Sequence, residues 1–283
     1  NQKKFASSKS SLLKKGAKLI QSRYAAAVFK RLGPLFMFNY QATPQALAGK
    51  VILVTGAGDG IGKAAALCYA KHGATVILLG KTTNKLTAVY DEIVAAGWPE
   101  PAIVPLDLKG ATAKHYKDMA ATIKAEFGKL DGVLHNAGLL GVLSPFEHLD
   151  LPTWQDIMQV NVTAAMLMSQ ALVPVLKLAT QASVVFTSSG VGRQGRAYWG
   201  GYAVSKFATE GLMQVMAAEY EGTSLRVNAI NPGATRTKMR SKAYPGEDQL
   251  SLPTAEQIMP LYLYLMSDDS KAVNGQSLDA QQK

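Results

Sequence analysis

The chain has 283 residues, of which 30 are Lys or Arg, 20 are Asp or Glu and one is Cys. An apolar fraction of 48% is ordinary for a folded protein and argues against a disordered chain. The single cysteine, Cys68, excludes an internal disulfide, and the absence of a run of about 18 apolar residues argues against a conventional membrane-spanning helix.

The positive charge is concentrated at one end of the chain. Residues 1–50 hold ten basic residues and no acidic ones, whereas the other 20 basic residues balance the 20 acidic residues of the remainder. We therefore divide the chain into a basic N-terminal arm, residues 1–46, and a neutral body, residues 47–283. Because the charge is not spread over the body, we expect no nucleic acid as a partner.

The arm begins Ser-rich, and apolar residues from Leu13 to Val28 recur every three or four positions, which predicts an amphipathic helix over 11–32. Such a basic segment is typical of mitochondrial targeting, and also of a helix that binds an anionic membrane surface or another protein subunit. A start at Asn1 rather than Met fits a processed or truncated product. We expect a mitochondrial location on the matrix side, associated with the inner membrane; a free tail and a cytoplasmic location are the alternatives.

Through the body, short β-branched runs alternate with helical patterns. Strands are predicted at 51–54, 74–79, 103–106, up to 134, 183–186 and 225–230, and helices at 60–72, 84–96, 112–127, 152–178 and 199–220. The strands are apolar on both faces, which indicates a parallel sheet covered by helices on both sides. We predict one α/β domain, a three-layer doubly wound sandwich with a mainly parallel, seven-stranded sheet.

A glycine-rich turn, Thr55-Gly-Ala-Gly-Asp-Gly-Ile-Gly62, joins the first strand to the first helix. Gly56 allows a tight turn, and Gly60 and Gly62 let a phosphate approach the backbone and let the helix pack on the strand. The helix N-terminus then directs N–H groups and its positive dipole end toward a pyrophosphate. The spacing favours a dinucleotide site over a connector that binds nothing.

A tyrosine and a lysine stand four residues apart in Tyr202-Ala-Val-Ser-Lys206, which places them on one face of a helix. A free tyrosine has a pKa near 10 and is a poor base at neutral pH. We expect the Lys206 cation to stabilise the phenolate and move the pKa of Tyr202 toward neutral pH. Since such a pair also occurs by chance, an exposed helix face is the alternative.

The order of these motifs resembles that in the classical branch of the short-chain dehydrogenase/reductase family over about residues 48–280. The amino-acid sequences of the motif segments are most similar to those of the YciK-like branch of bacterial oxidoreductases. The matching elements are the glycine-rich turn, Asp107, Asn136-Ala137-Gly138, Asn161, Ser189, Tyr202-x-x-x-Lys206 and Asn231-Pro232-Gly233. Ser189 lies 13 residues before Tyr202, a spacing typical of the family that the adjacent Ser188 lacks. The basic arm is not part of the resemblance.

The resemblance implies a Rossmann fold and a role for each matching residue. Tyr202 would be the general acid or base, Lys206 would tune it and hold the nicotinamide ribose, Ser189 would bind the substrate oxygen, and Asn161 would hold a water in a proton relay. The implied cofactor-binding residues are Gly56, Asp59, Gly60, Ile61, Gly62, Lys81, Asp107, Asn136, Ala137, Gly138, Tyr202, Lys206, Pro232, Gly233 and Thr237.

The choice of nicotinamide cofactor depends on the end of the second strand, which reads Leu78-Leu79-Gly80-Lys81. No acid is present there to bind a ribose 2′-hydroxyl, and Lys81 is placed to meet a 2′-phosphate, so we expect NADP(H), with NAD(H) as the alternative. Asp59 would be unfavourable near a phosphate unless it turns away or caps the helix.

Two functions remain open. The first is an NADP(H)-dependent oxidoreductase that interconverts a small carbonyl and an alcohol; the second is an accessory subunit of a membrane complex, such as a mitochondrial respiratory complex, docked through the arm with little or no turnover.

Residues 234–253 form the expected lid, whose basic residues Arg236, Lys238, Arg240 and Lys242 would favour an anionic substrate or clamp cofactor phosphates. The resemblance also allows a homo-oligomer, and the His and Cys spacing indicates no metal site. We expect His135 to be structural, with hydrogen bonds to neighbouring loops.

Overall fold

The computed structural model describes residues 38–281. The predicted helix over 11–32, and with it most of the predicted arm, lies outside the described residues. The boundary at residues 46 and 47 stays a prediction.

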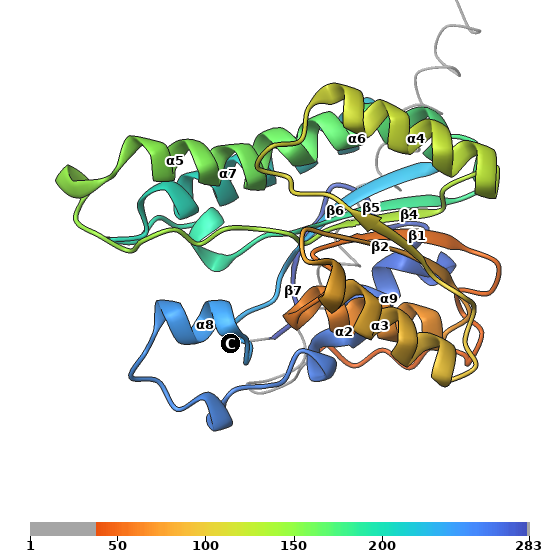
Figure 1. The fold of residues 1–283 in the computed structure, drawn as a ribbon, viewed down its shortest axis with the longest axis horizontal. Coiled ribbons are helices and arrows are strands. Elements are labelled where there is room, and N and C mark those ends of the chain that lie inside the picture. The colour runs from red at the N-terminus through yellow and green to blue at the C-terminus, as the bar shows by residue number, and fades with distance from the viewer. Residues whose placement is uncertain (1–37, 282–283) are drawn as a thin grey trace, which may run out of the picture. The chain divides into compact units, whose positions relative to one another are not determined.

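The centre of the domain is a parallel sheet of seven strands in the order β3-β2-β1-β4-β5-β6-β7 (Figure 1). The strands are β1 (Val51–Thr55), β2 (Thr75–Gly80), β3 (Ala102–Pro105), β4 (Gly132–His135), β5 (Ala182–Thr187), β6 (Leu225–Asn231) and β7 (Ser277–Asp279). All six pairings are parallel. The predicted three-layer, doubly wound fold is therefore confirmed.

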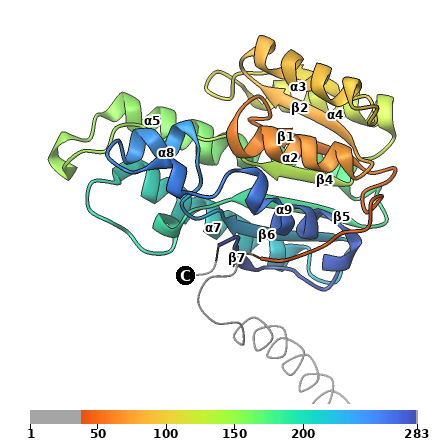
Figure 2. The same ribbon diagram turned by 90° about the horizontal axis from the view of Figure 1, so that it is seen from below.

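Helices cover both faces of the sheet (Figures 1 and 2). One layer contains α2 (Gly60–Lys71), α3 (Thr83–Ala95) and α9 (Met259–Met266), and the other contains α4 (Ala113–Phe127), α6 (Ala164–Leu176) and α7 (Gly200–Glu219). Each layer has its own apolar core against the sheet. This explains why the strands are apolar on both faces.

The long helix predicted at 152–178 is interrupted in the structure. It consists of α5 (Leu151–Met158), a π-helical turn η2 (Gln159–Thr163) and α6. Residues Leu151–Leu176 are long and apolar enough to cross a membrane by length and composition alone, yet 56% of the most apolar stretch is buried inside the domain. Its apolar character is therefore that of a core helix.

Several short elements near the end of the chain were not predicted individually. They are α8 (Lys238–Ala243), which lies in the expected lid, α9, and the edge strand β7, which pairs with β6 through only three residues. The remaining elements are 3-10 turns: η1 (Phe146–His148), η3 (Gly190–Gly192), η4 (Gln249–Ser251), η5 (Glu256–Ile258) and η6 (Asp268–Ser270).

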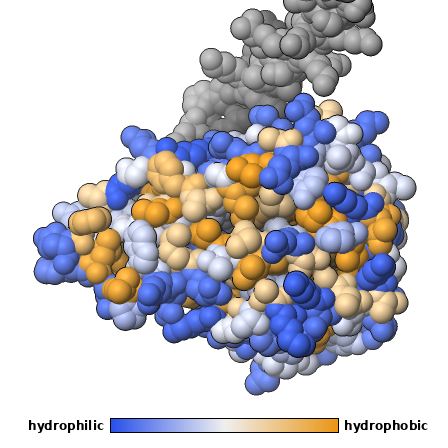
Figure 3. Space-filling view, turned by 90° about the horizontal axis from the view of Figure 1, so that it is seen from above, coloured by the Kyte–Doolittle hydropathy of each residue, from blue (hydrophilic) through white to orange (hydrophobic). Residues whose placement is uncertain are grey.

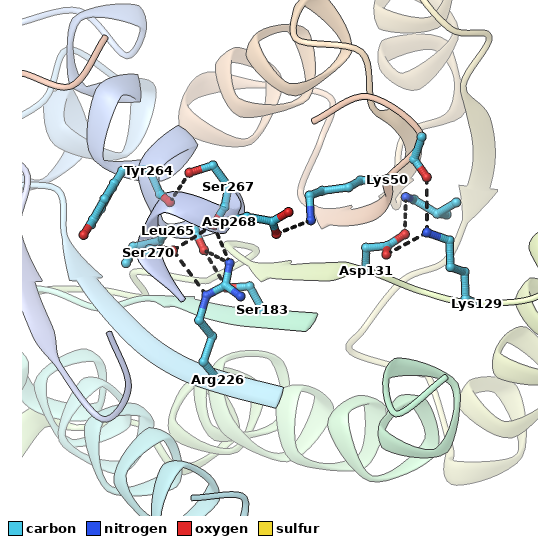
Figure 4. A network of polar contacts seen from close by, with 12 residues as sticks. Lys50, Lys129, Asp131, Ser183, Arg226, Tyr264, Leu265, Ser267, Asp268 and Ser270 are labelled. Carbon is cyan, nitrogen blue, oxygen red and sulfur yellow. Dashed lines mark hydrogen bonds and ion pairs between the residues drawn. The ribbon is translucent and has the colours of Figure 1, made fainter. Parts of the chain in front are cut away.

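A polar network ties together the amino ends of the strands, opposite the edge where β1 and β4 end (Figure 4). The Asp131 carboxylate accepts a hydrogen bond from the backbone N–H of Val51 at 2.9 Å and pairs with Lys129 at 2.9 Å. The buried Arg226 guanidinium donates to the carbonyl oxygen of Ser267 at 2.6 Å, and Lys50 pairs with Asp268 at 2.7 Å. These contacts hold the amino ends of β1, β4 and β6 in place.

The described residues before β1 pack against α9. The rings of Phe38 and Tyr40 lie 5.3 and 5.2 Å from that of Tyr264, and the Tyr40 hydroxyl donates to Asp269 at 2.5 Å. Leu47 is fully buried in the core beside α2 and α9. Residues 38–46 therefore pack against the body.

The outer face of the α4, α6 and α7 layer carries apolar side chains among polar ones (Figure 3). Met166 of α6 and Val204, Phe207 and Val215 of α7 are exposed. Their spacing puts the three α7 residues on one side of the helix.

Candidate active site

A crevice lies at the carboxyl ends of the strands, where the strand order reverses between β1 and β4. It consists of one cavity of about 320 Å³ and another of about 290 Å³. Both are lined by Gly56, Asp59, Ala137 and Gly138, so they are two ends of one crevice. This is the position at which open α/β sheets bind ligands.

The glycine-rich turn forms the floor where the two ends meet. Gly56 has a φ of +68°, a left-handed conformation that favours glycine, and a Cβ on Gly62 would lie 2.2 Å from the carbonyl oxygen of Gly56. The Thr55 hydroxyl accepts hydrogen bonds from the backbone N–H groups of Asn136 and Ala137 at 2.9 and 3.0 Å. These contacts fix the turn against the end of β4.

Asp59 lines the crevice and caps α2, which is one of the two arrangements that the sequence allowed beside a phosphate. Its carboxylate accepts a hydrogen bond from the backbone N–H of Gly60 at 2.9 Å and pairs with Lys85 at 2.6 Å and Lys238 at 3.1 Å. The hydrogen bond from Lys85 lowers the pKa of the Asp59 carboxyl. Its negative charge is thus matched by two cations from α3 and α8.

One end of the crevice is basic and lies beside β2 and β3. Lys81 and Asp107 both line it, together with Lys85 and Lys109. The Asp107 carboxylate accepts a hydrogen bond from the backbone N–H of Lys109 at 3.1 Å. Lys85 pairs with Asp59 at 2.6 Å and Lys109 with Asp156 at 2.7 Å, so of these three lysines Lys81 is the one left to meet a phosphate. Asp107 could accept a hydrogen bond from a base or a ribose.

The other end holds Ser189, Tyr202 and Lys206. Tyr202 and Lys206 are buried one turn apart on α7, with the ammonium 5.6 Å from the centre of the phenol ring. Lys206 donates a hydrogen bond of 2.7 Å to the carbonyl oxygen of Thr187, and Ser189 lines the same cavity as Tyr202. The helix face that carries the pair is therefore a cavity wall, not an exposed surface.

The expected lowering of the Tyr202 pKa was wrong. Burial raises the pKa of Tyr202 to about 12, although the Ser189 hydrogen bond acts in the other direction. Burial also lowers the pKa of Lys206 to about 8, while the charge of Glu210 opposes this change. Loss of hydration on burial is the largest cause of this change, so Tyr202 keeps its proton at neutral pH.

Asn161 lies deeper than the other predicted residues, in the π-helical turn. Its side-chain amide accepts from the backbone N–H of Leu139 at 2.7 Å and donates to the Leu139 carbonyl oxygen at 3.0 Å and to Ser205 at 2.9 Å. A cavity of about 10 Å³ lies between Asn161, Lys206 and His135, which is about the space of one water.

His135 makes contacts inside the core, as expected for a structural role, but its hydrogen-bond partner lies on a helix rather than on a neighbouring loop. Its ring is hydrogen-bonded to the Ser169 hydroxyl of α6 at 2.9 Å and stacks on Phe186 at 4.7 Å. Burial lowers the pKa of His135 to about 3. The loop partners that we expected are replaced because the side chain points into the core between β4 and α6.

The lid forms the remaining wall. Pro232, Gly233 and Thr237 line the crevice, and α8 follows with Lys238, Met239 and Arg240. Arg236 points to its own loop and donates to the carbonyl oxygens of Gln249, Leu250 and Leu252 at 2.8, 2.9 and 3.1 Å. Lys242 is exposed.

Most predicted residues meet in this crevice. Those that line it are Gly56, Asp59, Gly60, Ile61, Lys81, Asp107, Asn136, Ala137, Gly138, Ser189, Tyr202, Lys206, Pro232, Gly233 and Thr237. Gly62 is buried behind the turn, and Asn161 lies beneath Gly138. Trp199 lines the crevice and Tyr198 is exposed. Tyr244 and Glu247 were not predicted, and no motif in the sequence marks them.

The crevice fits a dinucleotide. The turn between β1 and α2 has glycines, without a Cβ, where its backbone atoms pack most closely. The two cavities together extend along the carboxyl ends of the strands from β3 to the lid. The Ser188 hydroxyl, which also lines the crevice, is buried without a hydrogen-bond partner among the described residues. A buried hydroxyl of this kind normally has a partner, which a ligand would supply. Within residues 38–281 no cluster of three His, Cys, Asp or Glu side chains has the geometry of a metal site.

Comparisons with known proteins agree with this geometry. A family model described as short chain dehydrogenase matches residues 50–248. The Escherichia coli oxidoreductase YciK is 52% identical over 243 residues, which are 86% of this chain and 96% of that protein.

Two solved structures are similar over nearly the whole described domain. A short chain dehydrogenase from Pseudomonas syringae is 55% identical, has a TM-score of 0.86 and covers 87% of this chain and 100% of its own. A short chain dehydrogenase from Escherichia coli CFT073, crystallised with NADPH, is 52% identical, has a TM-score of 0.84 and covers 85% of this chain and 100% of its own.

Proposed function

Because the chain belongs to the short-chain dehydrogenase family, we propose that it is an NADP(H)-dependent oxidoreductase that interconverts a carbonyl and an alcohol, with Tyr202 as the general acid or base. The observation that carries the proposal is the meeting of Tyr202, Lys206 and Ser189 in one crevice with the glycine-rich turn. The bound cofactor supplies the hydride, and the protein supplies orientation and the proton.

The protonated phenol of Tyr202 can donate its proton to a carbonyl oxygen, and the positive charge of Lys206 would have to offset the weaker acidity that the raised pKa of Tyr202 implies. With a pKa of about 12 the phenol is protonated at neutral pH. Ser189, which lines the same cavity as Tyr202, would bind the same oxygen and stabilise its developing charge. With a pKa of about 8, Lys206 is largely cationic at neutral pH and can stabilise the phenolate that remains. Asn161, beside the one-water cavity, would support the path that returns the proton.

The cofactor would lie along the whole crevice. Gly56, Gly60, Ile61 and Gly62 would hold the pyrophosphate at the N-terminus of α2, with Asp59 as the cap. Asn136, Ala137 and Gly138 would contact the adenosine ribose, Asp107 the adenine, and Pro232, Gly233 and Thr237 the nicotinamide end, with Lys206 on its ribose.

The preference for NADP(H) over NAD(H) is supported by Lys81 and by a relative. Lys81 and Lys85 line the basic end, where a 2′-phosphate would lie, and β2 ends without an acid. The 52% identical Escherichia coli CFT073 protein was crystallised with NADPH.

We further propose that residues 47–283 form the catalytic domain and that a homo-oligomer forms through the exposed apolar side chains of α6 and α7. The alternative, an accessory subunit of a membrane complex located in mitochondria, depends on the arm, most of which lies outside the described residues. No contact in the described part of the chain favours it over the enzyme.

The test is turnover of NADPH with a panel of aldehydes and ketones by the wild-type chain and by Tyr202→Phe. We expect wild-type turnover, a loss of at least about a hundredfold in Tyr202→Phe, and NADPH binding by both proteins. Tyr220→Phe, at the far end of α7, is the matched control and should keep full activity. Equal turnover by Tyr202→Phe and wild type would reject the proposal.

A further inference from the structure

The part of the crevice beyond Tyr202 is apolar. Leu140, Trp199, Met239 and Ala243 line it, and they come from the segment after β4, the segment before α7, and α8. Leu140 packs in one cluster with Tyr202, and Trp199, Met239 and Ala243 pack against that cluster. We call these four residues the apolar end; they surround the place where the part of a substrate next to its carbonyl would lie.

Aromatic rings continue from Tyr202 into the lid. The ring centres of Tyr202 and Trp199 are 5.7 Å apart, and those of Trp199 and Tyr244 are 5.9 Å apart, both at tilted angles. The Arg240 guanidinium lies 3.8 Å from the centre of the Tyr244 ring. Aromatic rings at these separations attract one another, and a flat apolar ligand can join such an arrangement.

The charged groups at this side of the crevice are already paired. Arg240 donates to both carboxylate oxygens of Glu247, from Nε at 2.6 Å and from Nη2 at 2.5 Å. Lys238 pairs with Asp59. Among the described residues that line this cavity, the remaining cation is Lys206, which is bonded to Thr187 and belongs to the cofactor end.

We propose that the substrate is an uncharged aldehyde or ketone whose carbonyl carries a ring or another flat apolar group, and that carboxylates and phosphates are rejected. This inference rests on the proposed function. In the reduction, the hydride of NADPH forms the new C–H bond, the C=O π bond breaks, and the oxygen takes the Tyr202 proton; the carbonyl is reduced and NADPH is oxidised to NADP⁺. A carboxylate in the apolar end would lose hydration without gaining a free cation.

Of the two expectations for the basic lid, an anionic substrate or a clamp on the cofactor phosphates, the first is therefore set aside. Arg236 holds the lid loop together, and Arg240 is neutralised by Glu247. Lys238 is held at Asp59, which it shares with Lys85, and its side chain is mostly exposed to solvent. Glu247 decides this specificity, because it stands behind Arg240 and cancels a charge that otherwise faces the cavity.

The experiment compares kcat/KM with NADPH for two aldehydes of the same shape, para-tolualdehyde and para-carboxybenzaldehyde, and for the small acyclic propanal. For the wild type we expect the neutral aryl aldehyde to exceed the carboxylate by at least about tenfold. In Glu247→Gln, which frees the Arg240 charge, this ratio should fall at least about fivefold. Trp199→Ala should lose most of the preference for para-tolualdehyde over propanal.

Glu256→Gln, an exposed acid in η5, is the matched control and should keep the wild-type ratio. A general disturbance of the lid by Glu247→Gln would lower both kcat/KM values and leave their ratio unchanged, which would overturn the inference. Equal or better turnover of the carboxylate by the wild type would overturn it as well, while the proposed function would stand. If NADPH binds and none of the three aldehydes is reduced, the proposed function fails and this inference fails with it.

Discussion

The buried imidazole of His135 makes a quantitative prediction about acid stability. Its pKa falls from an ordinary 6.5 to about 3 because the ring is buried between Ser169 and Phe186. Below pH 6.5 the unfolded chain therefore binds a proton that the folded chain does not, and the free energy of unfolding decreases as the pH falls. Above pH 6.5 the ring is uncharged in both states and the penalty disappears.

The size of the effect follows from the pH interval. Between pH 6.5 and about pH 4.5 the loss is about 1.4 kcal/mol per pH unit, which makes about 3 kcal/mol. Substitution His135→Asn removes the titrating ring but keeps a group that can bond to Ser169. The free energy of unfolding of wild type relative to His135→Asn should therefore decrease by about 3 kcal/mol from about pH 7.5 to about pH 4.5.

The assay is denaturant unfolding of both proteins at the two pH values, so that the carboxylates common to both cancel in the difference. His148→Asn, on the exposed turn η1, controls for effects of the substitution on the unfolded chain. A wild-type minus variant difference that is the same at both pH values would refute the argument that burial keeps this ring uncharged.

Three further predictions concern the cofactor crevice. Gly62→Ala places a Cβ 2.2 Å from the Gly56 carbonyl oxygen, so it should destabilise the turn by about 2 kcal/mol or more and weaken NADPH binding measured by calorimetry. The control is Gly110→Ala, where a Cβ meets nothing within 4 Å. Wild-type NADPH affinity of Gly62→Ala would contradict this prediction. Asp59→Asn keeps a good helix cap but removes a negative charge, so NADPH should bind a few times more tightly, most at low salt, and a weaker affinity would count against the reasoning. Lys81→Glu should shift the ratio of NADPH to NADH affinity by at least about tenfold toward NADH; an unchanged ratio would mean that Lys81 does not meet the 2′-phosphate.

Much of the fold could be predicted because its signals are local. The runs Val51–Val54 and Leu225–Ile230 are apolar on both faces, and each predicted strand is present within a residue or two at either end. Strand β7 could not be predicted, because Ser277–Asp279 is short and polar and becomes a strand only by pairing with β6. The π-helical turn at Gln159–Thr163 has no sequence signal that separates it from the α-helical pattern on either side.

Some features of the site could likewise be predicted from local sequence, whereas others depend on tertiary packing. The glycine-rich turn and the pair Tyr202 and Lys206 could be found because their spacing along the chain fixes their geometry. The pairing of Arg240 with Glu247 could not, because it depends on how the lid folds back on itself. The pKa of Tyr202 was predicted in the wrong direction because sequence shows the neighbouring charge but not the loss of hydration on burial.

The central claim is that a hydride passes between a bound nicotinamide and a carbonyl carbon that lies beside Tyr202. It is tested most directly with NADPH that carries deuterium at its transferable position, para-tolualdehyde as the acceptor, and mass spectrometry of the alcohol formed. We expect one deuterium on the carbinol carbon with the wild-type protein and almost no labelled alcohol with Tyr202→Phe, which should still bind NADPH. Alcohol without deuterium, or undiminished labelling by Tyr202→Phe, would contradict it.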